Sequence, residues 1–147
     1  MWTYEHSVDT RASKEAIWDL YSNIEKWTDW DKSLKSVSLE NNFSEGTKGT
    51  MLPVGQKEVC FKLVDVNDKV KFTSETSLTE AVKMSFVHKL TSVENNGVRI
   101  THRVVISGPG AKEIGAKIGP FLTKDIPETM NNLAEQALNL DLEKKNV

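Results

Sequence analysis

Three histidines and one tyrosine are the side chains of this sequence that best suit acid–base or metal chemistry. His6, His88 and His102 each occupy the apolar side of a segment in which apolar and polar residues alternate. Tyr4 lies on the same side of its segment as His6. An imidazole titrates near pH 6.5, so it can act as a general base, and its nitrogens are common zinc ligands. These four residues are the catalytic candidates. The alternative is that each histidine is an interior side chain bonded to a neighbouring hydroxyl or to a ligand.

The sequence contains no other recognised catalytic motif. The segment Gly108-Pro109-Gly110 does not continue as a dinucleotide-binding loop, since Glu113 stands where the third glycine belongs. There is no nucleophile elbow, no paired-histidine zincin motif and no Walker loop. Cys60 is the only cysteine, which excludes an internal disulfide and a multi-cysteine zinc site. We therefore predict no cofactor and no metal, and the three histidines are the only candidate cluster for metal ligands.

The composition is that of one globular domain, which we place over residues 1–147. The chain has 147 residues, of which 19 are basic and 21 acidic, with a formal net charge of −2. A chain of this length buries about 68–70% of the surface that it exposes when unfolded, which is enough for a hydrophobic core. Nucleic-acid binding through counterion release needs a basic stripe, and none is visible. No apolar run approaches the roughly 20 residues of a membrane span. Because the start of the chain shows no export signal, we expect a cytoplasmic protein.

Hydrophobic periodicity predicts an α+β arrangement. The segment Trp2–Val8 alternates as a strand does, and Ser13 is a helix N-cap that precedes an apolar stripe at helical spacing. A second short helical segment follows over 24–27. The period then returns to two for about six further strands between Leu34 and Ile106. From Ile114 to Ala137 apolar residues recur every three or four positions, as in an amphipathic helix.

A hairpin turn is predicted at Asn67-Asp68. A two-residue turn there would place Val66 opposite Lys69. Leu63 would then face Phe72 on the neighbouring strand, and both side chains would point to the same face of the sheet.

The connection that follows the strand ending near Leu78 determines whether the apolar stripe of the next strand faces the interior. A two-residue turn after the strand that ends near Leu78 would point Met84, Phe86 and His88 outward. We therefore predict an odd-numbered connection or a bulge, which keeps Phe72 on the same side as Phe86 and His88.

The C-terminal helix contains a Gly119-Pro120 pair. Inside a helix, glycine costs about 1 kcal/mol and proline about 3 kcal/mol relative to alanine. We therefore predict that the helix is interrupted at this pair, which would allow it to move as a gate and let a ligand pass under Phe121.

Two segments resemble the START/polyketide cyclase-dehydrase (SRPBCC) superfamily, whose helix-grip fold is also that of the birch-pollen allergen. Residues 16–31 read AIWDLYSNIEKWTDWD, which is similar to the family's helix followed by spaced tryptophans and an acidic residue. Residues 119–133 read GPFLTKDIPETMNNL, which is similar to the closing helix of polyketide-cyclase-like members. The resemblance covers essentially the whole chain. It implies a curved antiparallel sheet of about seven strands around a long C-terminal helix, with two short helices after the first strand.

In such a fold the inward face of the sheet and the long helix line a cavity. The resemblance and the strand alternation together imply these ligand-binding residues: Tyr4, His6, Trp30 near the mouth, Phe61, Phe72, Ser74, Met84, Phe86, His88, His102, Val104, Ile118, Phe121, Leu122 and Met130. The strand order of the fold would also place the first strand beside the last, and the last beside the strand of His88. The three histidines could then converge as a zinc site with an open position. A shared face does not establish a short distance, so separate interior histidines remain the alternative.

The resemblance indicates a fold more closely than a function, because the superfamily includes lipid carriers, cyclases, hormone receptors and chaperone activators. We predict the binding or transport of a small hydrophobic, lipid-like or polyketide-like molecule in an internal cavity. The enzyme alternative is a polyketide cyclase or dehydratase that uses the histidines or Tyr4 as acid–base groups. A third alternative is an adaptor that stimulates a protein partner. We expect a monomer or weak homodimer, without nucleic acid and without membrane insertion.

Overall fold

The structure is a computed structural model that describes residues 1–145. In this part of the chain one sheet of seven strands is accompanied by four α-helices and a short 3-10 turn. In chain order the elements are β1 (Trp2–Thr10), α1 (Lys14–Ser22), η1 (Ile24–Lys26), α2 (Trp27–Trp30), β2 (Leu34–Leu39), β3 (Lys48–Pro53), β4 (Val59–Asn67), β5 (Lys71–Ser77), β6 (Lys83–Val93), β7 (Gly97–Ser107), α3 (Ala111–Thr123) and α4 (Ile126–Lys145).

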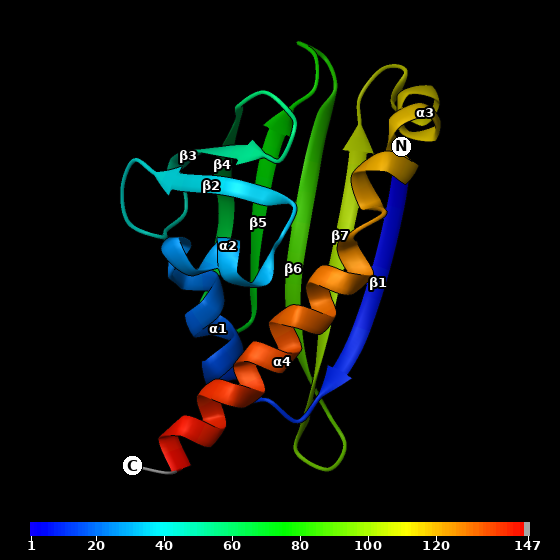
Figure 1. Ribbon diagram of the computed structural model, residues 1–147. Coiled ribbons are helices and arrows are strands. Elements are labelled where there is room, and N and C mark those ends of the chain that lie inside the picture. Colours follow the sequence, from blue (N-terminus) through cyan, green and yellow to red (C-terminus); the bar gives the residue numbers. More distant parts are fainter. Residues whose placement is uncertain (146–147) are drawn as a thin grey trace.

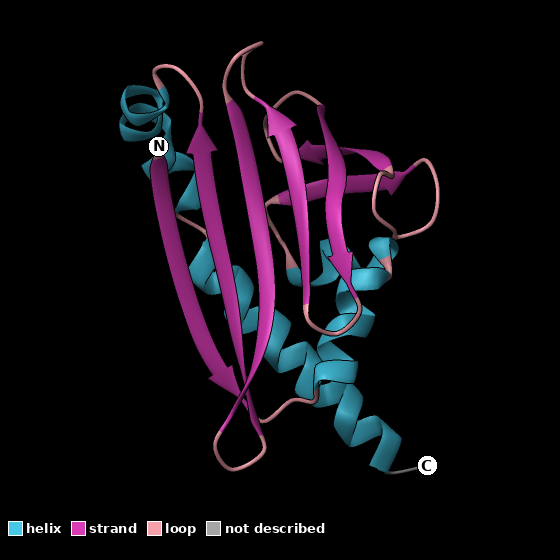
Figure 2. Cartoon of the chain, turned by 180° about the vertical axis from the view of Figure 1, so that it is seen from behind, coloured by secondary structure: helices cyan, strands magenta, loops and turns pink. Residues whose placement is uncertain are grey.

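The strands form an antiparallel sheet in the order β1-β7-β6-β5-β4-β3-β2, so that β1 and β2 are its edges. Helix α4 runs diagonally across one face of this sheet, with α1 and α2 beside it (Figure 1). Seen from behind, the strands lie in front of the helices, so the helices cover one face only (Figure 2). The predicted helix-grip α+β fold is confirmed, including the two short helices between β1 and β2.

The predicted beginning of the first helix is also confirmed. The Ser13 hydroxyl oxygen accepts a hydrogen bond of 3.1 Å from the backbone N–H of Ala16, which satisfies one of the free donors of the first turn. Ser13 in turn donates from its N–H and its hydroxyl to the two carboxylate oxygens of Asp141, each at 2.7 Å. These bonds join the start of α1 to the last turns of α4.

The β4–β5 hairpin differs from the predicted one. Asn67 pairs with Lys71, so the loop has three residues, and Lys69 adopts a left-handed φ of 60°. Leu63 is therefore opposite Ser74, whereas the prediction placed it opposite Phe72. The register shifts by one residue between Leu63 and Asp65, as in a β-bulge. The extra residue of the bulge offsets the extra residue of the loop, so that the apolar side chains of β4 on both sides of the bulge face the interior.

The β5–β6 connection has the predicted odd length. Ser77 pairs with Lys83, which leaves the five residues Leu78–Val82 between them. Phe72 consequently pairs with His88, and their side chains share the inner face of the sheet. The local alternation was therefore sufficient to predict an odd-numbered connection and the shared face of Phe72 and His88.

The predicted interruption at Gly119-Pro120 is wrong, because α3 continues through both residues and ends at Thr123. Glycine is required here by packing: a Cβ at Gly119 would lie 2.3 Å from Cζ2 of Trp2, whose ring lies against the helix. Pro120 leaves the carbonyl of Ala116 without its helical donor. Ala116 is exposed, so water can bind that carbonyl.

The break between the two C-terminal helices lies at Lys124-Asp125. The Asp125 carbonyl oxygen accepts a hydrogen bond from the backbone N–H of Thr129, and this bond closes the first turn of α4. Pro127 falls in the first turn, where a missing N–H removes no helical bond.

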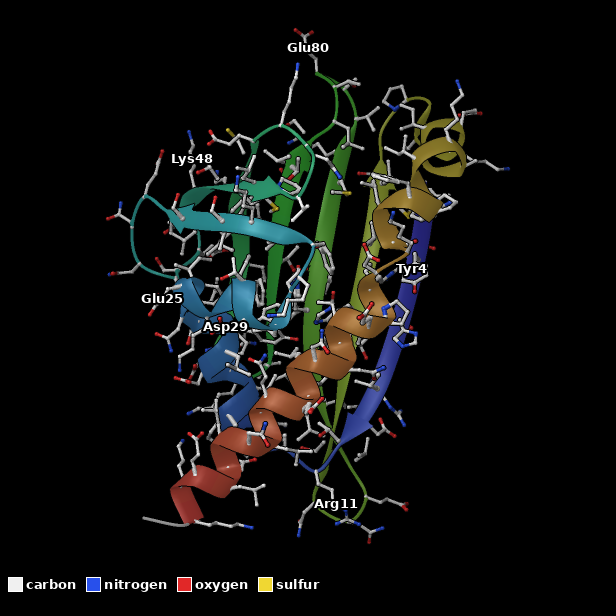
Figure 3. The ribbon with its side chains drawn as sticks, viewed as in Figure 1. Tyr4, Arg11, Glu25, Asp29, Lys48 and Glu80 are labelled. Carbon is white, nitrogen blue, oxygen red and sulfur yellow. The ribbon has the colours of Figure 1, made fainter. Side chains whose placement is uncertain are left out.

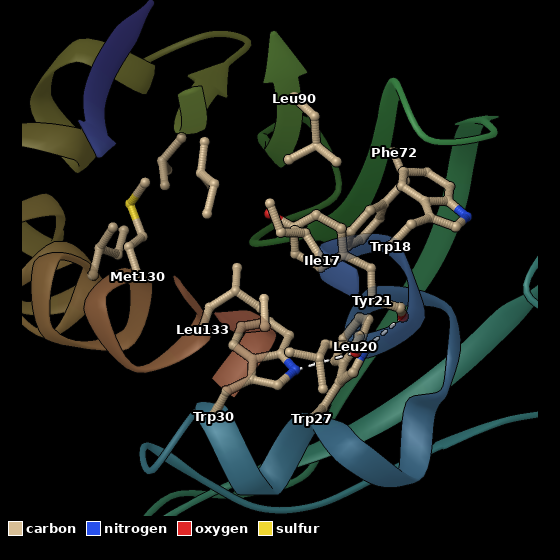
Figure 4. Close-up of a cluster of buried hydrophobic side chains, with 14 of the residues drawn as sticks. Ile17, Trp18, Leu20, Tyr21, Trp27, Trp30, Phe72, Leu90, Met130 and Leu133 are labelled. Atoms are coloured by element: carbon tan, nitrogen blue, oxygen red, sulfur yellow. Dashed lines mark hydrogen bonds between the residues drawn. The ribbon is translucent and has the colours of Figure 1, made fainter. Parts of the chain in front are cut away.

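Helix α4 and the first helices bury a continuous apolar core against the sheet (Figure 4). Met130 and Leu133 of α4 have no exposed surface, and neither does Ile17 of α1. None of the helices in residues 1–145 has the length and hydropathy that a membrane span requires.

Candidate functional site

The three histidines lie in one row across the sheet. His6 of β1 pairs with His102 of β7, and His102 pairs with His88 of β6. The ring centroids of His88 and His102 are 4.6 Å apart, with the ring planes at 73°. The strand order implied by the resemblance is thus the observed one, and it brings the histidine positions together.

This row does not form a metal centre. Within residues 1–145, no three histidine, cysteine or acidic side chains are arranged so that they could hold a metal ion. Nε2 of His102 is 2.8 Å from the Tyr21 hydroxyl, and Nδ1 of His88 is 3.4 Å from the Phe72 carbonyl oxygen. The protein therefore uses one nitrogen of each ring for its own hydrogen bonds. For His102 the alternative interpretation, an interior histidine bonded to a hydroxyl, is correct.

Burial keeps both inner histidines neutral. His102 is 1% exposed and His88 is 6% exposed. Desolvation, followed by the charge of His6, lowers the pKa of His102 to about 3. Desolvation also lowers the pKa of His88 well below its ordinary value, and the nearby His102 lowers it further. The carbonyls near His88 favour its charged form but do not outweigh burial.

Aromatic rings enclose His88 on several sides. Its ring is sandwiched between Phe72 at 3.9 Å and Phe86 at 4.4 Å, with interplanar angles of 5° and 10°. Tyr21 meets it at 5.6 Å in an edge-on arrangement. These contacts hold the imidazole in one orientation.

Tyr21 is the hydrogen-bond partner of His102, and the sequence did not predict this role. It was assigned only to the apolar stripe of the first helix, together with Ile17 and Leu20. In the structure it is fully buried, which raises the pKa of its hydroxyl well above the ordinary value. A tyrosine in a buried stripe needs a hydrogen-bond partner for its hydroxyl, and this requirement was the available signal.

The inner face becomes more open toward the start of β6. On this strand Leu90 and His88 are buried, whereas Phe86 and Met84 are only half-buried. The contacts of Phe86 with the rings of His88 and His102 show that it faces the same side. We refer to the region of Met84 and Phe86 as the open end of the inner face.

The other candidate ligand-binding residues are either buried or half-buried. Phe61, Phe72, Val104 and Met130 are buried in the core, and Ser74 is buried beside Phe86. Ile118 and Leu122 of α3 are half-buried, as are Tyr4 and His6 of β1. Tyr4 lies on the edge strand against which both C-terminal helices pack (Figure 3).

Two candidates are not where the resemblance placed them. Trp30 is 3% exposed and its indole N–H donates to the Leu20 carbonyl at 3.1 Å, so it belongs to the core and not to an opening (Figure 4). Phe121 is 54% exposed, with the Lys124 ammonium 4.7 Å from its ring centroid. It faces solvent because Gly115 and Gly119 occupy the side of α3 that packs on Trp2.

The concave side beneath α1 and α2 is filled by side chains. Tyr21 and Trp18 pack against Phe72, and Phe43 reaches the same ring from the loop between β2 and β3, with centroids 5.1 Å apart. Two surface depressions lie elsewhere. One of about 290 Å³ is lined by residues of segments 9–11 and 93–97, and one of about 490 Å³ is lined by residues of loop 40–48.

Comparisons with known proteins agree with this arrangement. A family model described as polyketide cyclase/dehydrase and lipid transport matches residues 1–137. A truncated norcoclaurine synthase from Thalictrum flavum superposes with a TM-score of 0.74 at 14% identity, covering 93% of each chain. Ara h 8.0201 gives 0.73 at 16% identity, covering 94% of this chain and 98% of its own. A hypothetical protein from Helicobacter pylori gives 0.75 at 11% identity, covering 92% and 88%. At these identities the structures show a shared fold. No curated protein matches the sequence.

Proposed function

Because the chain belongs to the polyketide cyclase/dehydrase and lipid transport family, we propose that it binds a small hydrophobic molecule at the inner face of its sheet. The proposed binding region is the open end, with Met84 and Phe86 as its floor. The bound molecule would lie above the buried histidine pair. A cytoplasmic location and a monomeric or weakly dimeric state remain predictions from the sequence.

The observation that carries this proposal is the change in burial along the inner face of β6. Leu90 and His88 are covered by the protein, but Phe86 and Met84, on the same face, are half-buried. Covering apolar surface is favourable by about 25 cal/mol per Å², so a small apolar molecule gains free energy by completing the cover. Methionine is flexible and polarisable, and its side chain can adapt to molecules of different shape.

Burial of the Tyr21–His102 pair argues against its use as an acid–base pair and favours binding without chemistry. The Tyr21 hydroxyl and His102 are bonded to each other, and both are almost completely buried. A general acid or base must come within hydrogen-bond reach of the group on which it acts. Norcoclaurine synthase is an enzyme by name and shares the fold, but at 14% identity this carries no residue role to the present chain.

The direct test is a fluorescence titration with N-phenyl-1-naphthylamine, a neutral apolar probe. We expect saturable binding to the wild-type protein and a loss of affinity of about tenfold in Phe86→Ala, since truncation removes apolar contact area. Val87→Ala is the matched control, because Val87 pairs with Thr73 and Arg103 on the outer face of the same strand. Thermal unfolding of each variant verifies that it folds.

Two results would overturn the proposal. One is the absence of saturable probe binding, combined with the absence of any co-purifying small molecule in native mass spectra of protein from its own host. The other is equal loss of affinity in Phe86→Ala and Val87→Ala, which would place the probe elsewhere. Binding of a protein partner alone would favour the adaptor alternative.

A further inference from the structure

The backbone hydrogen bond of His88 determines which of its ring nitrogens carries the proton. Nδ1 is 3.4 Å from the carbonyl oxygen of Phe72, and a carbonyl oxygen can only accept, so Nδ1 donates. Burial lowers the pKa of His88 well below its ordinary value, so the ring carries a single proton at neutral pH. Nε2 is therefore unprotonated and can act only as a hydrogen-bond acceptor.

Nε2 of His88 remains available to a ligand. It has no hydrogen-bond partner among residues 1–145, and in this range no completely buried side-chain nitrogen or oxygen lacks one. Nε2 accordingly retains some accessible surface, although the residue is only 6% exposed. Its neighbour toward the open end is Phe86, which is half-buried. A ligand that covers Phe86 would also exclude water from Nε2. If that ligand offers no hydrogen-bond donor, Nε2 becomes a buried acceptor without a partner, which costs free energy.

On the strands that flank this nitrogen, the inner face carries no lysine, arginine, aspartate or glutamate. On β5, β6 and β7 the residues that share the face of His88 are Phe72, Ser74, Thr76, Met84, Phe86, Leu90, Ser92, Val98, Ile100, His102, Val104 and Ile106. The charged residues of these strands alternate onto the outer face; Glu75, for example, bonds with Lys83 there. The remaining polar neighbours, His102 and Tyr21, are neutral and bonded to each other. A carboxylate brought to this part of the face would lose its hydration without gaining a lysine or arginine partner from these strands.

From these three observations, and resting on the proposed function, we propose that His88 selects a neutral ligand that donates a hydrogen bond. The geometry favours an apolar molecule with a hydroxyl or N–H group that points to Nε2. It disfavours a molecule of the same shape that has only acceptors, and it disfavours an anion. His88 is then the residue that determines specificity at the open end.

The test compares three naphthalene derivatives of similar size by their displacement of N-phenyl-1-naphthylamine at pH 7.4. These are 2-naphthol, a donor; 2-methoxynaphthalene, an acceptor only; and 2-naphthoate, an anion. We expect 2-naphthol to bind about tenfold more tightly than 2-methoxynaphthalene, as for one satisfied buried hydrogen bond, and 2-naphthoate to bind most weakly. In His88→Phe the advantage of 2-naphthol should disappear, while 2-methoxynaphthalene binds as well as before or better. Val87→Ala, on the outer face of the same strand, is the matched control and should retain the preference.

The outcomes separate this inference from the proposed function. If the fluorescent probe binds but 2-methoxynaphthalene or 2-naphthoate equals 2-naphthol, the donor selection is wrong and hydrophobic binding stands. If the probe does not bind at all and no small molecule co-purifies, the proposed function is wrong. Should His88→Phe fail to fold, a long-range ¹H–¹⁵N spectrum of the wild-type imidazoles gives an independent answer. The inference requires a neutral ring protonated at Nδ1, and a ring protonated at Nε2 would overturn it.

Discussion

The hydroxyl of Tyr21 and Nε2 of His102 lie 2.8 Å apart and form a hydrogen bond that links α1 to the centre of β7. Both residues are within the core, and apolar side chains surround them. A polar pair of this kind is tolerated inside a protein only while both partners are present, since either one alone leaves an unsatisfied buried group.

Tyr21→Phe should therefore lower the free energy of unfolding by about 1–3 kcal/mol, the cost of an unpaired buried partner. The phenylalanine keeps the ring contacts with Phe72 and Trp30, so loss of packing does not account for the effect. Urea unfolding measures the change. Adding His102→Phe to this variant should recover part of the loss, because it removes the unpaired nitrogen. Tyr4→Phe, on the half-buried edge strand, should change stability less.

Stability should decrease on mild acidification. His102 binds a proton near pH 6.5 in the unfolded chain but only at a pKa of about 3 in the folded one. The contribution of His102 to the free energy of unfolding is therefore complete above about pH 7, and it is lost as the pH falls from 6.5 toward 3. Between pH 7 and pH 5 this amounts to about 2 kcal/mol. The lowered pKa of His88 acts in the same direction, and the raised pKa of Asp31 acts in the opposite direction at lower pH.

Urea unfolding at pH 7 and pH 5 measures this dependence. The variant His102→Phe should lose less stability than the wild type between the two values, although it starts from a lower stability because Tyr21 has lost its partner. Equal losses in both proteins would show that His102 is already charged or is accessible to water in the folded state.

Gly115→Ala should destabilise the protein, although alanine is the better helix former by about 1 kcal/mol. A Cβ at this position would lie 2.2 Å from Cγ of Trp2, and the helix cannot move away without uncovering the indole. Thermal unfolding should give a lower Tm. Removal of the indole in Trp2→Ala should abolish this effect, so that Gly115→Ala then becomes neutral or stabilising. A rise in Tm with Trp2 in place would contradict the observed packing of α3.

Asp141→Asn should weaken the attachment of α4 to the start of α1. The Asp141 carboxylate accepts both from the backbone N–H and from the hydroxyl of Ser13. An amide offers only one oxygen, and its NH₂ group faces a donor. We expect a loss of about 1–2 kcal/mol in urea unfolding, as for hydrogen bonds to a charged group. Glu143→Gln, an exposed neighbour on the same helix, is the control and should have little effect.

Alternation along the chain predicted much of the site, because it depends on local backbone geometry alone. Successive side chains of a strand point to opposite faces, so His88 and Phe86 had to share a face wherever their strand was placed. The same parity required the odd connection after Ser77, and the structure has it. Ser13 was identified as a helix cap for an equally local reason, since its side chain bonds within the turn that it begins.

The structural features that the sequence did not predict all depend on which elements pack against each other. Phe121 has the apolar character of a core residue, but it faces solvent because the neighbouring glycines of α3 are the side that fits against Trp2. Glycine is needed at position 119 because Trp2, more than a hundred positions away in the sequence, packs closely against it. The low helix propensity of glycine had indicated a helix end, but the helix continues. Tyr21 was predicted as packing, and only the approach of α1 to β7 made it the hydrogen-bond partner of His102. Periodicity determines the direction of a side chain relative to its own element. The distances between elements, and with them the bonded pairs and the open end of the inner face, are determined by the packing of the whole chain.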